Sequence, residues 1–261
     1  MIEFKKVTFC YPSYGQEPKK ALDDVSFSIS DGDFVGIAGD MGSGKTTLCR
    51  LLCGLLKPSS GQIEKTGTVS FAMQFSESQL FESTVIKDVM FGPLNLDLSG
   101  NDARRISEES LGLMGLDQSF FERNPLRLSG GEKRRVALAG VLSMDADTIV
   151  LDEPCAGLDS KWHDRLYEIL HELNSRGKTI IVVSHNIDDI ARNFGKLLYL
   201  KDAKLADIGT AKDVICRNDE LETLSKSFAR RLSESGMEID YRKAVTTEDL
   251  ASLIADRLSS L

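Results

Sequence analysis

Gly39-Asp40-Met41-Gly42-Ser43-Gly44-Lys45-Thr46-Thr47 is the stretch around which the rest of the chain is organised. The apolar residues 34–38 before it predict a buried strand, and the Leu-rich residues 48–52 after it predict a helix. Its spacing fits the phosphate-binding loop pattern, in the strand-loop-helix context that the pattern requires, at Gly39, Gly44, Lys45 and Thr46. A glycine-rich turn that only caps a helix does not explain the lysine, the threonine and both flanking elements. The stretch therefore predicts a site for a nucleoside triphosphate.

The residue types in this loop suit a polyphosphate. Glycines let successive backbone N–H groups turn inward onto phosphate oxygens, and the helix N-terminus adds positive potential. Lys45 is expected to reach the β and γ phosphates, and the Thr46 hydroxyl is expected to bind Mg²⁺. The loop residues that we assign to nucleotide binding are Gly39, Gly42, Ser43, Gly44, Lys45, Thr46 and Thr47.

The charge and apolar content of the chain limit the kinds of partner that we expect for it. The chain of 261 residues has 32 basic and 40 acidic residues, a net charge of −8, and no basic block that would suggest a nucleic-acid partner. The N-terminus has no apolar signal region, and charges interrupt every span before it reaches about 18 apolar residues. We therefore expect a cytosolic protein that reaches a membrane only through a partner. Five cysteines should stay reduced, and Cys49 and Cys53 are better explained as small packing residues than as half a metal site.

The first 33 residues predict strands. Residues 2–9 alternate apolar and polar, and Tyr11 after them is a candidate to stack on an adenine, although a tyrosine packed at a strand end explains it nearly as well. Residues 25–29 alternate again, and the turn at Asp31-Gly32 predicts a hairpin with the strand before the phosphate loop.

Downstream, residues 67–73 predict a strand that delivers Gln74. Residues 83–91 predict a helix that ends at Gly92-Pro93, and residues 101–125 are expected to be helical. From about residue 217 the composition changes to charged helix, with residues 244–258 amphipathic.

Leu128-Ser129-Gly130-Gly131-Glu132 begins another predicted helix. Ser129 and Glu132 satisfy the capping-box pattern, so a well-capped helix is the simplest interpretation. That interpretation leaves two adjacent glycines unexplained, because glycine costs helix stability. Exposed glycines at a capped helix start instead predict a second anion site at Ser129, Gly130 and Gly131.

Two more predicted strands end in polar residues. Residues 148–152 form an apolar run that ends in Asp152 and Glu153, where two carboxylates are costly unless a cation or hydrogen bonds meet them. Residues 178–183 form the next run and end at Ser184 and His185. The carboxyl ends of strands in α/β proteins carry their sites, so these side chains are expected beside the phosphate loop. The other two histidines, His163 and His171, are expected on a helix surface.

Together these residues resemble the ATP-binding cassette (ABC) ATPases over roughly residues 1–215. The motifs occur in that family's order: the phosphate loop, Gln74, the signature at 128–132, Asp152-Glu153, the loop of Asp159, and His185. The resemblance implies an α/β phosphate-loop NTPase with an antiparallel β subdomain, a RecA-like parallel-sheet core, a helical subdomain and a C-terminal helical appendage. Residues 74–93 are similar to the energy-coupling factor ATPases, which power uptake of cobalt, nickel and vitamins in prokaryotes.

The resemblance also implies roles. Lys45 would neutralise the γ-phosphate, Thr46 and Gln74 would ligate Mg²⁺, and Asp152 would hold the metal's water shell. Glu153 would act as general base on the attacking water, and His185 would contact the γ-phosphate. Ser129, Gly130 and Gly131 would close over ATP bound to a second subunit, with Asp159 at the seam. Glu132 stands where glutamine is commoner and Cys155 where threonine is frequent, and neither argues for an inactive site.

The implied organisation is a nucleotide-binding domain over 1–216, with its helical part at about 84–143, and a helical extension over 217–261 that could dimerise. The implied partners are a second ATPase, identical or different, a transmembrane scaffold and a substrate-capture membrane subunit, at the cytoplasmic face of the membrane. The scaffold would dock near residues 75–91, where four apolar residues are either groove lining or core: Met73, Leu80, Phe81 and Met90.

The competing functions share parts of this pattern. Another ABC importer or exporter is the nearest alternative. A soluble ABC ATPase acting on DNA or ribosomes usually needs a coiled-coil insertion or a second cassette, which 261 residues do not contain. A phosphate-loop kinase would not explain the signature helix or His185.

Overall fold

The computed structural model describes residues 1–12, 19–74 and 80–259. Its centre is a six-stranded sheet in the order β5-β6-β7-β3-β8-β9, in which all neighbours except β8 and β9 are parallel. The strands are β5 (Val69–Ala72), β6 (Thr148–Asp152), β7 (Thr179–Val183), β3 (Phe34–Gly39), β8 (Lys196–Lys201) and β9 (Lys204–Thr210). This parallel core matches the sequence prediction.

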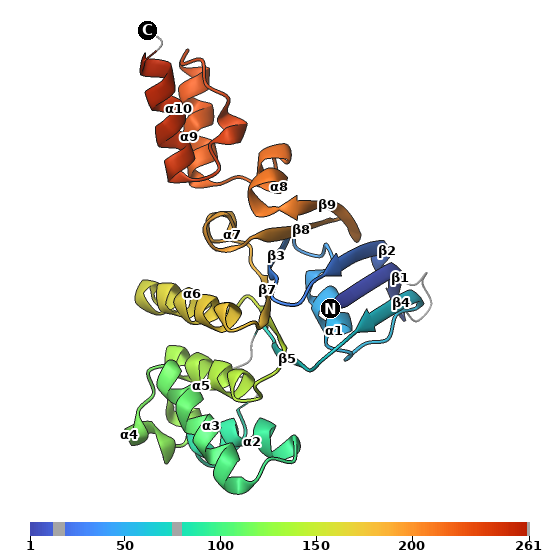
Figure 1. Ribbon diagram of the computed structural model, residues 1–261, viewed down its shortest axis with the longest axis vertical. Coiled ribbons are helices and arrows are strands. Elements are labelled where there is room, and N and C mark those ends of the chain that lie inside the picture. Colours follow the sequence, from blue (N-terminus) through green and yellow to red (C-terminus); the bar gives the residue numbers. More distant parts are fainter. Residues whose placement is uncertain (13–18, 75–79, 260–261) are drawn as a thin grey trace.

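Both faces of this sheet are covered, which explains the continuous apolar runs in its strands. In β7, Ile180 and Val182 join one hydrophobic cluster, and Ile181 and Val183 join the other. One cluster contains α1 (Lys45–Leu52) and the N-terminal strands. The other contains α6 (Ser160–Ser175), α7 (Ile187–Asn193), α8 (Ala211–Arg217) and the helices of the lower part of Figure 1.

A second, three-stranded sheet has the order β2-β1-β4 and is antiparallel. Its strands are β1 (Ile2–Tyr11), β2 (Lys19–Ile29) and β4 (Ser60–Lys65), the last of which the sequence did not predict. The predicted hairpin between β2 and β3 is wrong: the turn exists, but β2 pairs with β1 and β3 pairs with β7 and β8. The reason is burial, because β3 is covered on both faces and therefore lies inside the parallel sheet.

The helices of residues 85–142 form a separate group, drawn in green below the sheets in Figure 1. They are α2 (Val85–Asn95), α3 (Gly100–Leu113), α4 (Gln118–Phe121), the 3₁₀ turn η2 (Pro125–Arg127) and α5 (Gly130–Leu142). The predicted helical stretch 101–125 is thus broken into several pieces.

The predicted end of α2 at Gly92-Pro93 is also wrong, because the helix continues to Asn95. A proline inside a helix has no N–H for the carbonyl four residues earlier, which here belongs to Val89. The Ser143 hydroxyl donates to that carbonyl at 3.0 Å. The same hydroxyl lies 2.9 Å from the Gly140 carbonyl, so the Val89 carbonyl shares with Gly140 a donor that stands in for the N–H that Pro93 lacks.

The chain ends in α9 (Leu224–Glu234), the 3₁₀ turn η3 (Tyr241–Lys243) and α10 (Thr247–Ser259), at the top of Figure 1. Lys226 of α9 is fully buried and donates from Nζ to the carbonyls of Ile215 and Asn218, both at 2.8 Å. These bonds attach the first turn of α9 to the end of α8. None of the helices in the described ranges is both long enough and apolar enough to span a bilayer.

The two cysteines of the phosphate-loop helix pack as predicted. Cys49 is fully buried, and Cys53 is half-buried. Burial raises the pKa of the Cys53 thiol to about 12, so it stays protonated at neutral pH.

Candidate active site

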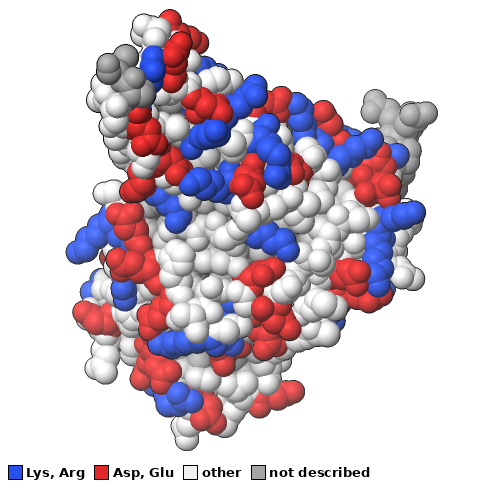
Figure 2. Space-filling view, turned by 45° about the horizontal axis from the view of Figure 1, so that its top comes forward, with Lys and Arg blue, Asp and Glu red and all other residues white. Residues whose placement is uncertain are grey.

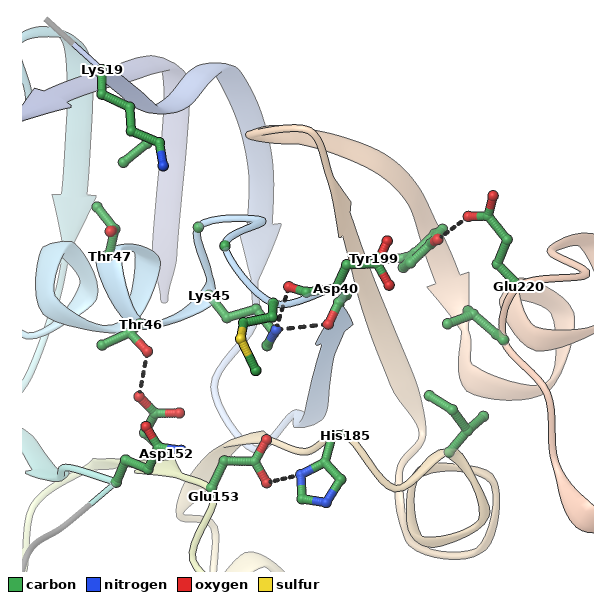
Figure 3. A pocket seen from close by; sticks show the side chains of 18 of the residues that line it. Lys19, Asp40, Lys45, Thr46, Thr47, Asp152, Glu153, His185, Tyr199 and Glu220 are labelled. Carbon is green, nitrogen blue, oxygen red and sulfur yellow. Dashed lines mark hydrogen bonds and ion pairs between the residues drawn. The ribbon is translucent and has the colours of Figure 1, made fainter.

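A cavity of about 850 Å³ lies at the carboxyl ends of the parallel strands (Figure 3). The ends of β3, β6 and β7 meet there because parallel strands all finish at the same edge of a sheet. The sequence-predicted residues that line it are Tyr11, Gly39, Gly42, Gly44, Lys45, Thr46, Thr47, Gln74, Asp152, Glu153 and His185. The fold thus brings together residues separated by up to 174 positions, from Tyr11 to His185.

The loop between β3 and α1 needs glycine at two of its positions. Gly39 has φ +150°, and a Cβ there would lie 2.2 Å from the Leu200 carbonyl oxygen. Gly44 has φ +107°, and a Cβ there would lie 2.3 Å from the Ala21 carbonyl oxygen. Ser43, also assigned to nucleotide binding, is 3% exposed, and its hydroxyl has no hydrogen-bond partner within the described ranges.

Lys45 folds back over this loop. Its Nζ donates to the carbonyls of Gly39 at 2.7 Å and Asp40 at 2.8 Å. Burial lowers the pKa of Lys45, against the opposing effect of Glu153 and Asp152 nearby. The Lys45 ammonium is held by two carbonyl dipoles inside the cavity, where it can bind a phosphate. The negative charge of that phosphate would raise the pKa of Lys45 again.

Asp152 and Thr46 form the polar pair below the loop. The Thr46 hydroxyl donates to Asp152 Oδ2 at 2.8 Å, and Asp152 is 2% exposed. Burial raises the pKa of Asp152, although the Thr46 hydrogen bond and Lys45 act against it. A bound cation would compensate the buried carboxylate.

The donor set here is one carboxylate, one hydroxyl and the amide of Gln74. In the part of the chain that the structure describes, no three His, Cys, Asp or Glu side chains cluster to hold a metal. Oxygen ligands in small number suit Mg²⁺, which keeps several waters and binds through one or two side chains plus phosphates. The residues present therefore fit Mg²⁺ bound together with a nucleotide.

Glu153 and His185 form the second pair. Glu153 Oε2 lies 2.7 Å from His185 Nδ1, and the Glu153 side chain is 12% exposed while that of His185 is 80% exposed. The backbone of Glu153 has φ +52°, and its N–H donates to the Val183 carbonyl at 3.1 Å. The Glu153 carboxylate is thus largely buried at the cavity wall and contacts an exposed imidazole. This arrangement suits a general base that takes a proton from a bound water.

Tyr11 shows features of both predicted alternatives. Its ring packs edge-on against Phe9 with centroids 4.9 Å apart, as for a tyrosine at a strand end. Its hydroxyl lies 3.3 Å from Thr47 Oγ1 and accepts from Arg50 Nη1 at 3.4 Å, and the residue lines the cavity. Stacking on a base stays a prediction.

The signature residues Ser129, Gly130 and Gly131 do not line this cavity, and neither does Asp159. Ser129 caps α5: its hydroxyl accepts from the Glu132 N–H at 3.3 Å, and Glu132 Oε2 accepts from the Ser129 N–H at 2.8 Å. Asp159 caps α6 by accepting from the Trp162 N–H at 2.9 Å. Within one chain Ser129 and Asp159 are therefore helix caps, and Gly130 and Gly131 form the first turn of α5.

Sequence reasoning missed several residues. Arg134 of α5 is 2% exposed and donates to the carbonyls of Gln74 and Glu153, and an arginine inside the charged run 132–135 gave no sign of burial. Glu220 and Leu221, assigned to the extension, line the cavity, and Tyr199 donates to Glu220 at 2.5 Å (Figure 3).

Both histidines of α6 reach the surface: His171 is exposed, and His163 is partly exposed, at 26%, and lies 2.9 Å from Asp189 Oδ2. The helical pattern alone could not reveal the contact of His163, because the Asp189 carboxylate comes from α7.

Comparison with known proteins places these features in a family context. Residues 22–156 match the ABC transporter family model. The energy-coupling factor transporter ATP-binding protein EcfA2 of Streptococcus agalactiae serotype Ia is 38% identical, with 91% of this chain and 93% of that protein aligned. EcfA2 of Caldanaerobacter subterraneus subsp. tengcongensis is 39% identical over 91% of each chain.

Two solved structures have folds similar to that of this chain. The dimeric, post-hydrolysis ATP-binding cassette MJ0796 bound to ADP and Pi superposes with a TM-score of 0.74 at 31% identity, over 81% of this chain and 99% of that one. CbiO1 from Clostridium perfringens, part of the ABC transporter complex CbiONQ, superposes with a TM-score of 0.72 at 28% identity, over 90% of this chain and 96% of that one.

Proposed function

The chain belongs to the ABC transporter family, among the energy-coupling factor ATP-binding proteins, and we propose that it hydrolyses ATP to energise an importer of vitamins or transition-metal ions. The observation that carries this proposal is the convergence of the phosphate loop, the Thr46–Asp152 pair and the Glu153–His185 pair on one cavity. The alignment with EcfA2 proteins over nine tenths of the chain supports the importer type.

Phosphoryl transfer to water is mostly positioning and charge stabilisation. The loop amides and Lys45 bind the β and γ phosphates, and Lys45 releases its two carbonyl partners to do so. Thr46 and Gln74 would ligate Mg²⁺ and Asp152 would hold its water shell, and the ion would neutralise charge at the phosphates. Glu153 takes a proton from the attacking water through its carboxylate, and His185 orients that carboxylate before contacting the γ-phosphate.

Replacement of Glu153 tests the assignment of the base. Glu153→Gln keeps the shape and removes the basic carboxylate, so we expect ATP binding to persist and phosphate release to fall by about 100-fold or more. Phosphate release at the wild-type rate would remove Glu153 from this role. Size-exclusion chromatography of the variant with ATP should show a stable closed dimer.

The second nucleotide contact comes from another subunit in this proposal. Ser129, Gly130 and Gly131 lie away from the chain's own cavity, so they close over ATP bound to a partner, and Asp159 lies at the seam. We assign residues 1–216 to the nucleotide-binding domain, about 84–143 to its helical part and 217–261 to an extension that contributes to dimerisation. Three exposed apolar side chains of the extension support that role: Leu224, Phe228 and Leu258.

The membrane partner is proposed to dock on α2. Of the four residues considered for its groove, Leu80 is buried and Met90 packs against the core, whereas Phe81 is 61% exposed. Met73 is half-buried, and residues 75–79 of that prediction lie outside the described residues. Phe81 packs edge-on against Phe91 with centroids 4.9 Å apart, and Leu94 and Leu96, at the end of α2, are also exposed. This apolar surface suits a transmembrane scaffold at the cytoplasmic face.

A nucleic-acid partner has no support. On the face shown in Figure 2, basic and acidic side chains are interspersed, and the net charge is −8. A phosphate-loop kinase would leave the signature helix without a role.

The test is affinity purification of the tagged chain from gently solubilised membranes of its native host, followed by identification of the co-purifying proteins. Recovery of one transmembrane scaffold with small, varying membrane subunits supports the energy-coupling proposal, and the presence of a second ATPase decides between a homodimer and a heterodimer. A dedicated pair of permeases would change the transporter class. Recovery of ribosomal or DNA-bound proteins without membrane proteins would contradict the transport proposal.

A further inference from the structure

Arg134 is a buried cation that the mechanism above does not use. It lies in the second turn of α5 and is 2% exposed. Its Nη1 donates to the Gln74 carbonyl at 2.6 Å, its Nη2 to the Glu153 carbonyl at 2.6 Å, and its Nε to the Pro154 carbonyl at 3.3 Å. Burying a guanidinium is costly unless its donors are satisfied, so these contacts define its place in the fold.

The carbonyls that Arg134 binds belong to segments that are separate in the sequence. Gln74 follows β5, and Glu153 follows β6. Both side chains line the cavity, and both are expected to act on the metal or the attacking water. One planar guanidinium with a fixed fork of donors therefore sets the spacing between the two backbones.

Glu153 needs such support because of its backbone. A non-glycine residue at φ +52° lies in the left-handed region, which is strained and persists only where the surroundings impose it. The Glu153 N–H is held by Val183 and its carbonyl by Arg134. With both ends of the residue held, the carboxylate points at His185.

We propose that Arg134 is a positioning residue for ATP hydrolysis, which fixes the Glu153 carboxylate and the Gln74 amide relative to each other. The inference rests on the proposed function of the cavity. Arg134 lies five residues after Ser129, the N-cap of the same helix.

Arg134→Lys, compared with Arg135→Lys, tests the proposal. Arg135 is the next residue of α5 and also donates to backbone carbonyls, those of Met114 at 2.9 Å and Gly115 at 3.3 Å, but these lie in the turn after α3. In both variants lysine keeps the positive charge but lacks the planar set of N–H donors that arginine has. We expect Arg134→Lys to lower kcat about 10- to 100-fold with ATP affinity within about twofold, because misplaced catalytic groups slow chemistry while the phosphate loop still binds.

Arg135→Lys should keep kcat within about twofold of the wild type. Trp162, the single tryptophan of the chain, lies under the Arg135 guanidinium at 4.3 Å and reports by its fluorescence whether α5 and α6 still pack. In a Glu153→Gln background, Arg134→Lys should lower the residual rate by less than about threefold, because a residue that acts through Glu153 has little left to affect.

Three results would overturn the proposal: an unchanged kcat in Arg134→Lys, an equal loss in Arg135→Lys, or loss of ATP binding together with an unfolded Trp162 spectrum in Arg134→Lys. The last result would assign Arg134 to folding alone. Failure of the wild-type protein to bind or hydrolyse ATP would contradict the proposed function instead, independently of either variant.

Discussion

Helix α1 begins directly after Gly44, and α5 begins with Gly130 and Gly131, yet the two N-termini are capped in opposite ways. At α1 the N-cap is Gly44, no side chain caps the helix within the described ranges, and the first turn, Lys45 to Thr47, carries no acid. At α5 the N-cap is Ser129, and Glu132 completes a capping box. The free N–H groups of α1 are open to a phosphate. Those of α5 are partly occupied by the chain's own side chains.

The glycines at the two helix starts also differ in whether the fold itself requires them. A Cβ on Gly39 or Gly44 would collide with a backbone carbonyl of the chain itself. A Cβ on Gly130 would meet nothing within 4 Å, and one on Gly131 only the Gly157 carbonyl at 3.7 Å. The fold therefore requires the first pair and not the second. The comparison supports the proposal that the start of α1 forms an anion site within one chain, whereas the glycines of α5 serve a molecule outside it.

The largest effect should come from removing the cation of the α1 site. Lys45→Ala leaves the loop amides in place but removes the ammonium that is expected to meet the β and γ phosphates, so we expect hydrolysis to fall by about 100-fold or more. Phosphate release measures it. Lys57→Ala, at an exposed lysine beyond the end of α1, is the control. Equal activity of the two variants would show that α1 does not carry the phosphate site.

Gly39→Ala should have the next largest effect. The added Cβ would lie 2.2 Å from the Leu200 oxygen at a φ of +150°, so the loop must move or the fold must yield, at a cost of about 3 kcal/mol. We expect a lower Tm and loss of ATP binding, measured by thermal unfolding and by nucleotide titration. Gly42→Ala keeps the strain of a positive φ without any collision, and it should be milder. Equal losses in both variants would mean that contact with Leu200 is not the cause.

The sequence was enough for the α1 site because all of its signals are local. Apolar runs predict strands that end at one edge, and a spacing of glycines with lysine and threonine needs no distant partner. The failures were non-local. The pairing of β2 with β1 depends on which sheet buries β3 on both faces. The continuation of α2 through Pro93 involves a contact between the Val89 carbonyl and Ser143, which are 54 residues apart. The burial of Arg134 depends on two strand ends that the sequence could not place against α5.

Gly130→Ala tests whether the glycines of α5 serve an outside molecule. Glycine in a helix costs roughly 0.5–1 kcal/mol relative to alanine, and the added Cβ has open space, so the variant should be more stable by up to this amount, about 2 °C in Tm. ATP hydrolysis should fall, because the methyl group occupies the surface that a partner's nucleotide approaches. A variant that gains stability and keeps full hydrolysis would show that α5 contacts no nucleotide.

The smallest effect should come from Glu132, the acid that closes the α5 site. Its carboxylate accepts from the Ser129 N–H and hydroxyl, both at 2.8 Å, so a partner's γ-phosphate meets a negative charge and an occupied hydroxyl. Glu132→Gln keeps the shape and removes the charge, and we expect ATP-driven dimerisation and hydrolysis to rise about two- to fivefold. Asp102→Asn is the matched control, since Asp102 meets Ser99 at the start of α3 in the same way, with 2.6 Å between Ser99 Oγ and Asp102 Oδ2. It should leave hydrolysis unchanged.

Glu132→Gln should also change how the stability of the protein depends on pH. The Ser129 N–H and hydroxyl hold the pKa of Glu132 below its ordinary value. A carboxyl whose pKa is lower in the folded protein stabilises it above the unfolded pKa, about 4.3, and loses that contribution as the pH falls through the folded value. The wild type should therefore be slightly more stable than Glu132→Gln at neutral pH, and the difference in Tm should shrink below about pH 4.3. A difference in Tm that does not change with pH would show that the charge of Glu132 does not stabilise the folded protein.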